Sequence, residues 1–209
     1  MKATDFNLPE NLKFDFANGI TSFGNSRLII LSSKAMGLLR HNIIKQVGVD
    51  NARKLLYKFG YQNGYTDFLE IRANYKFDTL NDLLASGPTI HTWEGIVQAT
   101  PKEIKIDHLS KQFYFSGVWK NSYEAQQHLL YYEKGNLPVC WSLMGYAAGW
   151  CTAFWGNTIL CVEPKCMGMG HENCEWELKP LADWDPKVIA PYLEAVLEGQ
   201  EDMLESRES

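Results

Sequence analysis

The sequence predicts an α+β fold, and three observations lead to this expectation. Apolar residues recur with helical spacing through the first half of the chain, from Ser33 to about residue 86. From Thr89 onward, short segments typical of β-strands alternate with polar turns. The chain has 209 residues, of which 45% are hydrophobic, so it suits one large domain, or one domain with appendages, and not a disordered chain. Helices followed by an antiparallel set of strands form the α+β class.

The first half is expected to contain an arm or hairpin, a strand and three helices. Asn18-Gly19 lies between apolar residues, as in a hairpin turn. Gly60 and Gly64, four residues apart in the second helix, permit a close helix contact or a kink. The expected elements are a hairpin or arm within 1–25, a strand at 27–32, a helix from Ser33 to Gly48, a helix from Asp50 through Ile71, and a short helix that begins at Asp78 or Thr79 and stops at Ser86-Gly87-Pro88.

The second half is expected to contain five strands and three helices. The uncharged run 135–162 is long enough to cross a bilayer and contains Gly145-x-x-x-Gly149. Polar residues dilute this run, and Gly156-Asn157 splits it, so a buried helix followed by a buried strand fits better. The expected elements are strands at 94–100, 103–108 and 112–119, a helix capped by Ser122 that runs through Tyr132, a buried helix at 139–155, strands at 158–163 and 174–179, and a last helix from Asp185-Pro186 to near Glu205.

Composition excludes some function classes. The chain has 20 basic and 25 acidic residues, a net charge of −5, and so lacks the basic footprint of a nucleic-acid binder. Residues 1–16 have no apolar core of the kind found in signal peptides. All five cysteines lie in the last third of the chain. We therefore expect a cytoplasmic, reducing setting, with no membrane partner and no direct contact with nucleic acid, where clustered thiols more often bind metal than form disulfides.

Glu163-x-x-Cys166-x₇-Cys174 is the segment with the clearest chemistry. Two glycines between the thiols let the backbone curl so that both sulfurs can face one point. A tetrahedral zinc site needs a fourth ligand. Cys140 at a helix start is favoured over the mid-helix Cys151, since about 16 Å of helix would separate the two. Cys161 is ambiguous and His171 is a rival ligand, and the residues alone leave a zinc site and ordinary buried core equally open.

Several motifs together resemble one protein family. The similarity runs from about Arg27 to Trp184 and is densest after Thr89. The chain resembles the effector-sensing domain of the aromatic-responsive, sigma-54-dependent bacterial activators of the XylR, DmpR and MopR type, and its second half resembles a 4-vinyl reductase-type domain. The motifs are Pro138-Val139-Cys140-Trp141, Met144-Gly145-Tyr146-Ala147-x-Gly149, Thr152-Ala153-Phe154, Cys166-x-Gly168-Met169-Gly170-His171-x-x-Cys174 and Lys179-Pro180-Leu181-x-x-Trp184.

The resemblance implies two sites. In that family a structural zinc ion is held by Cys-Glu-Cys-Cys, and these ligands fall on Cys140, Glu163, Cys166 and Cys174. The family's anchors for a phenolic ligand fall on His91 and Trp119. An indole N–H can only donate and a neutral imidazole nitrogen can accept, so the pair suits a phenol hydroxyl, although a core histidine and a packed tryptophan are the plain alternatives. Trp150 and Cys161 stand where phenol sensors of the family often carry Tyr, and Leu84, Trp93 and Phe115 are further wall candidates by pattern.

The resemblance also implies a domain organisation and a function. We expect an N-terminal arm at 1–30 that contributes to a homodimer, a sensor domain at 31–185 whose zinc-binding half is about 120–185, and a linker helix at 186–209 that is either a coiled-coil relay or docked on the domain. The expected function is to bind a small aromatic and relieve repression of an ATPase domain; that domain and a DNA-binding domain are not in this sequence. The alternatives are a vinyl-reductase-type tetrapyrrole enzyme, for which the sequence offers no nucleotide fingerprint, and a lipid-binding adaptor of the same fold.

Overall fold

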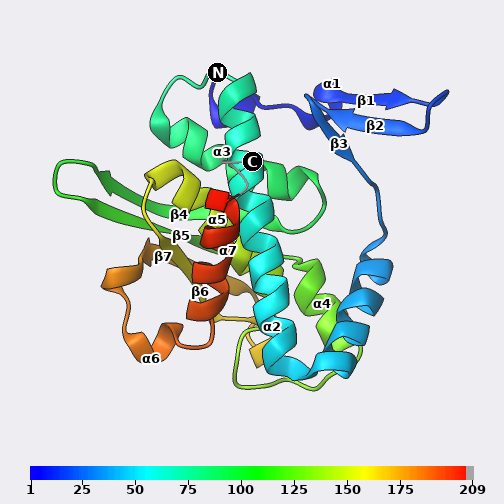
Figure 1. Ribbon diagram of the computed structural model, residues 1–209, viewed down its shortest axis with the longest axis vertical. Coiled ribbons are helices and arrows are strands. Elements are labelled where there is room, and N and C mark those ends of the chain that lie inside the picture. Colours follow the sequence, from blue (N-terminus) through cyan, green and yellow to red (C-terminus); the bar gives the residue numbers. More distant parts are fainter. Residues whose placement is uncertain (206–209) are drawn as a thin grey trace.

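The α+β class is confirmed by the computed structural model, which describes residues 1–205. Figure 1 shows a four-stranded sheet covered by helices, with a small three-stranded sheet at one corner. Seven α-helices and seven strands are found in the described residues. The helices are α1 (Leu8–Asn11), α2 (Ser33–Asn74), α3 (Leu80–Trp93), α4 (Tyr123–Leu129), α5 (Trp141–Trp155), α6 (Pro186–Ile189) and α7 (Leu193–Glu205). The strands are β1 (Leu12–Asp15), β2 (Ile20–Phe23), β3 (Ser26–Leu28), β4 (Gln98–Asp107), β5 (Gln112–Lys120), β6 (Ile159–Lys165) and β7 (Cys174–Pro180).

The main sheet has the order β4-β5-β7-β6 and is antiparallel throughout. The two strands expected at 94–100 and 103–108 are wrong: one strand, β4, replaces them, and its register shifts between Pro101 and Glu103. Proline has no N–H for a ladder, and a bulge lets the strand continue past it. Residues 94–97 precede the strand because Gly95 turns the chain with φ 73°.

Helix α2 bends at Gly48, where the sequence predicts a helix end. Gly48 has φ 80° and ψ 166°, a conformation that a side chain disfavours, so the ribbon changes direction there (Figure 1). The helix begins one residue earlier than a Ser33 cap would place it, because Ser32 is the N-cap and accepts a hydrogen bond from the Ala35 N–H.

Two glycine pairs hold α2 and α5 in close contact. Gly60 and Gly64 on α2 meet the backbone of Ser142 and Tyr146, while Gly145 and Gly149 on α5 meet the backbone of α2. The close contact predicted for Gly60 and Gly64 is therefore confirmed, and the Gly145-x-x-x-Gly149 pair serves the same crossing. No helix in the described part of the chain has the length and apolarity needed to cross a membrane.

Helix α3 does not stop at Pro88 as predicted but continues to Trp93. Proline removes the N–H that would bond to the carbonyl of residue 84, which normally breaks a helix. Here the Trp150 indole N–H donates to the Leu84 carbonyl at 3.2 Å and replaces the missing bond. Gly87 leaves room for the same ring, since a Cβ there would lie 2.8 Å from Trp150 Cε2.

The two ends of the chain differ from prediction in detail. The hairpin at Asn18-Gly19 is confirmed by β1 and β2, but the strand expected at 27–32 ends at Leu28, and an extended segment with exposed Ile29 and Ile30 leads to α2. The single last helix is wrong, because α6 and α7 are separated at 190–192. Helix α7 packs along α2, as in the docked alternative, with Gly199 against the Tyr61 ring. The last residues of the expected linker, 206–209, lie outside the described residues.

Candidate metal centre and aromatic chamber

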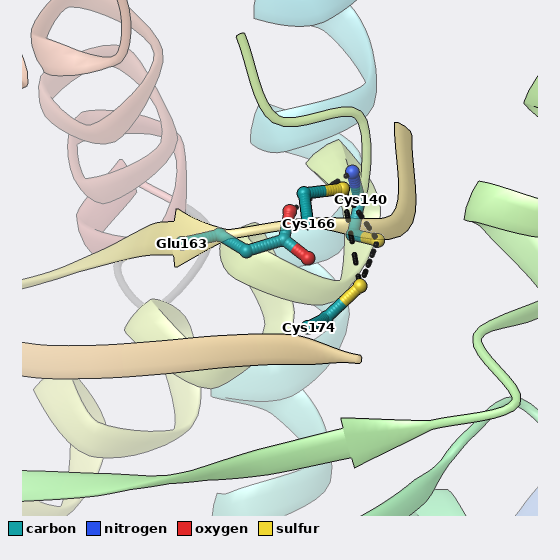
Figure 2. A group of neighbouring side chains, drawn as sticks. All are labelled: Cys140, Glu163, Cys166 and Cys174. Atoms are coloured by element: carbon teal, nitrogen blue, oxygen red, sulfur yellow. Dashed lines mark hydrogen bonds between the residues drawn. The ribbon is translucent and has the colours of Figure 1, made fainter. Parts of the chain in front are cut away.

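Four buried side chains converge on one point. Figure 2 shows Cys140, Glu163, Cys166 and Cys174 directed toward one another, and their ligand atoms all lie within 4.8 Å of each other. The Sγ–Sγ separations are 4.0 Å for Cys140–Cys166, 3.7 Å for Cys140–Cys174 and 3.8 Å for Cys166–Cys174. Thiolates about 2.3 Å from a tetrahedral zinc ion have sulfurs about 3.8 Å apart. The cluster therefore has the spacing that a tetrahedral metal requires.

The carboxylate of the cluster also fits a cation. Glu163 is 1% exposed, and its Oε1 has no hydrogen-bond partner among the described residues. Burial raises the pKa of the Glu163 carboxyl and of the Cys140 thiol, because both charged forms are cut off from water. A divalent cation reverses this preference and supplies the missing partner. The donor set of three sulfurs and one oxygen thus fits a metal better than it fits plain core.

The other predicted ligand candidates lie outside this cluster. His171 is beside it, but its Nδ1 faces the backbone of Cys166 at 3.2–3.3 Å. Cys151 is buried on α5, and Cys161 lies on β6 with its backbone bonded to the Tyr57 hydroxyl. All five cysteines are free thiols.

An apolar chamber lies between α3, α5 and the main sheet. Its cavity volume is about 30 Å³. His91 from α3, Trp119 and Phe115 from β5, and Trp150 from α5 contribute to its walls, so four of the predicted ligand residues meet in one place. The other wall residues are Gly87, Pro88, Ala99, Tyr146, Ala147, Cys151, Trp176 and Leu178.

His91 is the titratable base of the chamber. Burial lowers the pKa of His91 to about 3, because an imidazolium would lose its hydration there. The imidazole is therefore neutral at pH 7 and has one nitrogen that can accept a hydrogen bond. Its ring lies against the Tyr146 ring, with the centroids 3.9 Å apart.

Three predicted wall residues are placed elsewhere. Leu84, Trp93 and Cys161 are not among the described residues that line the chamber. Leu84 is fully buried behind it and bonds to Trp150 through its carbonyl. Trp93 packs toward the N-terminal segment, with its ring 6.4 Å from that of Phe6. The pattern that nominated them did not include the direction in which each side chain points.

Sequence reasoning missed Trp176 and Leu178, although a signal was present. Strand β7 alternates buried and half-buried residues from Cys174 onward. Because side chains alternate across a strand, an inward metal ligand at Cys174 also places Trp176 and Leu178 inward. Tyr146 was missed as well, and it lies one helical turn before Trp150 on α5.

Comparison with known proteins identifies the family. The model XylR_N, described as activator of aromatic catabolism, matches residues 7–107, and the model of the vinyl-4-reductase domain matches residues 119–180. The solved phenol-responsive sensory domain of the transcription activator PoxR, crystallised with phenol, is 31% identical; the similarity covers 91% of this chain and 94% of that one, with a TM-score of 0.83. The chain belongs to this family of sensory domains.

Two curated relatives extend the comparison. The sensory domain is 32% identical over 180 residues to the phenol regulator MopR of Acinetobacter guillouiae, and 27% identical over 177 residues to the transcriptional regulatory protein XylR of Pseudomonas putida. Each match takes in 85% of this chain but only 32% and 31% of those proteins, respectively. The sensory domain thus spans about a third of the length of the curated relatives it matches.

The metal cluster and the chamber of the sensory domain share two elements. Cys140 is the N-cap of α5, which carries Tyr146 and Trp150 further along. Cys174 begins β7, which carries Trp176. A metal at the cluster therefore fixes the start of two elements that form the chamber walls.

Proposed function

We propose that this chain senses a small aromatic effector, a phenol or a related benzene derivative, for a sigma-54-dependent transcription activator. The observation that carries the proposal is that His91 and Trp119, from different elements, line one apolar chamber. The similarity to the PoxR domain crystallised with phenol supports it. The domain works in the cytoplasm, where its free thiols stay reduced.

In this proposal the chamber recognises a ring and one hydroxyl. The Trp119 indole N–H donates to the ligand oxygen, and the neutral His91 imidazole accepts the hydroxyl proton. Phe115 and Trp150 contact the ring and exclude water. An unpaired buried hydroxyl costs about 1–3 kcal/mol, so this latch favours phenols over the corresponding benzenes.

Calorimetric titration of purified, metal-loaded protein with phenol, catechol and alkylbenzenes tests this function. We expect saturable micromolar binding of a phenol, and its loss in His91→Ala and in Trp119→Ala. Trp155→Phe is the matched control, because Trp155 stacks on His108 and is not a chamber wall residue. Absence of heat with every aromatic, or unchanged affinity in both chamber variants, would refute the proposal.

We further propose that the cluster of Cys140, Glu163, Cys166 and Cys174 holds one structural zinc ion. Four protein ligands leave no open position for chemistry, so the ion would brace the 166–174 loop against the start of α5. Elemental analysis should give one zinc per chain, and Cys166→Ser should lose both the metal and much of the stability. Cys151→Ser should retain the metal; full retention in Cys166→Ser would contradict the assignment.

Homodimerisation through the N-terminal arm is also part of the proposal. Apolar side chains on this arm face solvent, with Phe16 90%, Ile29 78% and Ile30 76% exposed. Exposed apolar patches of this kind mark interaction surfaces. Sedimentation equilibrium should give about twice the chain mass of 23.9 kDa, and Ile29→Glu with Ile30→Glu should give a monomer. Leu109→Glu, at a 97% exposed position on the β4–β5 turn, is the control that should stay dimeric.

Signal output is assigned to the C-terminal segment. A ligand can shift an equilibrium only if it binds two states unequally. Helix α7 lies on α2, which also crosses the chamber helix α5, so a change in α5 reaches α7 through direct packing. The bias would then pass to an ATPase domain beyond this segment.

A further inference from the structure

The chamber contains a second indole donor that the phenol latch does not use. Trp176 is 2% exposed, and its Nε1 has no hydrogen-bond partner among the described residues. By contrast, the Trp150 N–H donates to the Leu84 carbonyl. A buried donor without an acceptor costs about 1–3 kcal/mol, so Trp176 is a position where a ligand can gain free energy.

The packing around Trp176 keeps its ring at the chamber wall. Trp176 lies opposite Gly117 in the β5–β7 register, and a Cβ at Gly117 would come within 2.7 Å of Trp176 Cε2. The Phe115 ring meets the indole edge-on, with the centroids 4.8 Å apart, and the Trp119 ring lies 5.9 Å away. The indole is therefore held beside the proposed phenol anchor and has little freedom to turn toward solvent.

We propose that Trp176 is a second polar anchor and that the sensor selects phenols that carry a second acceptor oxygen on the ring, such as a methoxy or a further hydroxyl group. This inference rests on the proposed function. His91 and Trp119 serve the first hydroxyl, and the Trp176 N–H donates to the second oxygen. A ligand with only one oxygen leaves this donor unpaired, whereas a methoxy oxygen accepts from it and adds no proton of its own.

Matched ligand pairs test the selection. Methoxyphenols and ethylphenols, each substituted at position 2, 3 or 4, have similar shape and differ in the acceptor oxygen. We expect calorimetry to show one methoxyphenol binding roughly three- to tenfold more tightly than its ethyl counterpart, the range of one net hydrogen bond. In Trp176→Phe this ratio should fall to about one while the ethylphenol still binds. Trp155→Phe should keep the ratio.

A second measurement does not depend on the variant. In ¹H–¹⁵N spectra of the unmodified protein, the Trp176 indole resonance should move downfield with the preferred methoxyphenol and not with its ethyl counterpart. Equal affinity within all three pairs, or a methoxy preference that persists in Trp176→Phe, would overturn this inference and leave phenol sensing intact. Failure of every phenol to bind would overturn both.

Discussion

Replacing Gly149 by alanine tests the helix crossing on which the chamber is built. A Cβ at position 149 would lie 2.8 Å from the Tyr61 carbonyl carbon and 3.0 Å from its Cα, and closer still to its oxygen. Ordinary contacts begin near 3.4 Å, so α2 and α5 would have to separate by at least about 0.6 Å. Backbone atoms cannot move aside by changing rotamer, so the strain falls on the whole contact.

The expected loss of stability follows from two opposing effects. Overpacking costs about 1–3 kcal/mol, and more against rigid backbone, while alanine gains about 1 kcal/mol of helix propensity over glycine. A net loss of about 2 kcal/mol lowers the melting temperature of a domain of this size by about 4–8 °C. Thermal unfolding followed by circular dichroism measures this. The same separation displaces Trp150, so phenol affinity should weaken as well.

Gly135→Ala is the matched control. A Cβ at Gly135 meets nothing within 4 Å, so this variant should melt within about 2 °C of the parent. If Gly149→Ala melts with Gly135→Ala and binds phenol normally, the close crossing is refuted.

Buried ionisable groups give three further predictions. Burial raises the pKa of Asp67 to about 6 despite a hydrogen bond from Tyr146, so its carboxylate destabilises the fold as pH rises through 6. Asp67→Asn should therefore raise the free energy of unfolding by about 1–2 kcal/mol at pH 8 and change it little at pH 4.5; equal effects in urea titrations at both pH values would contradict this. Because the pKa of His91 is about 3, phenol affinity measured by calorimetry should change less than twofold between pH 5 and 8, and a tenfold loss at pH 5 would show that the imidazole titrates. Arg40 and Glu124 form a buried ion pair, with Nε and Oε1 3.5 Å apart, so Arg40→Ala should destabilise by about 3–5 kcal/mol and Arg40→Met with Glu124→Gln by less; equal losses on urea unfolding would deny the pairing.

Local signals in the sequence predicted much of the fold. The caps at Thr79 and Ser122 are confirmed, because each side chain accepts a hydrogen bond from a backbone N–H in the first turn of its helix. The bend at Gly48 is predictable for the same reason, since it depends on one residue's conformation. Features of this kind need no knowledge of distant residues.

Features that depend on tertiary contacts were not predictable in the same way. Helix α3 passes Pro88 only because Trp150, 66 positions after Leu84, bonds to the Leu84 carbonyl. Strand β4 continues past Pro101 because β5 pairs with it on both sides of the bulge.

The candidate site divides along the same line. The four metal-cluster residues are recognisable by side-chain chemistry and spacing, and the structure brings them together. The chamber is formed by side chains from α3, α5, β4, β5 and β7, so Trp176 becomes visible only when β7 is placed beside β5.

A crystal structure of this chain grown with phenol tests the central claim most directly. The account predicts one ring in the chamber, with its oxygen within hydrogen-bond distance of both Trp119 Nε1 and a nitrogen of His91. A ring bound outside this chamber, or one inside it whose oxygen contacts neither side chain, would contradict the account.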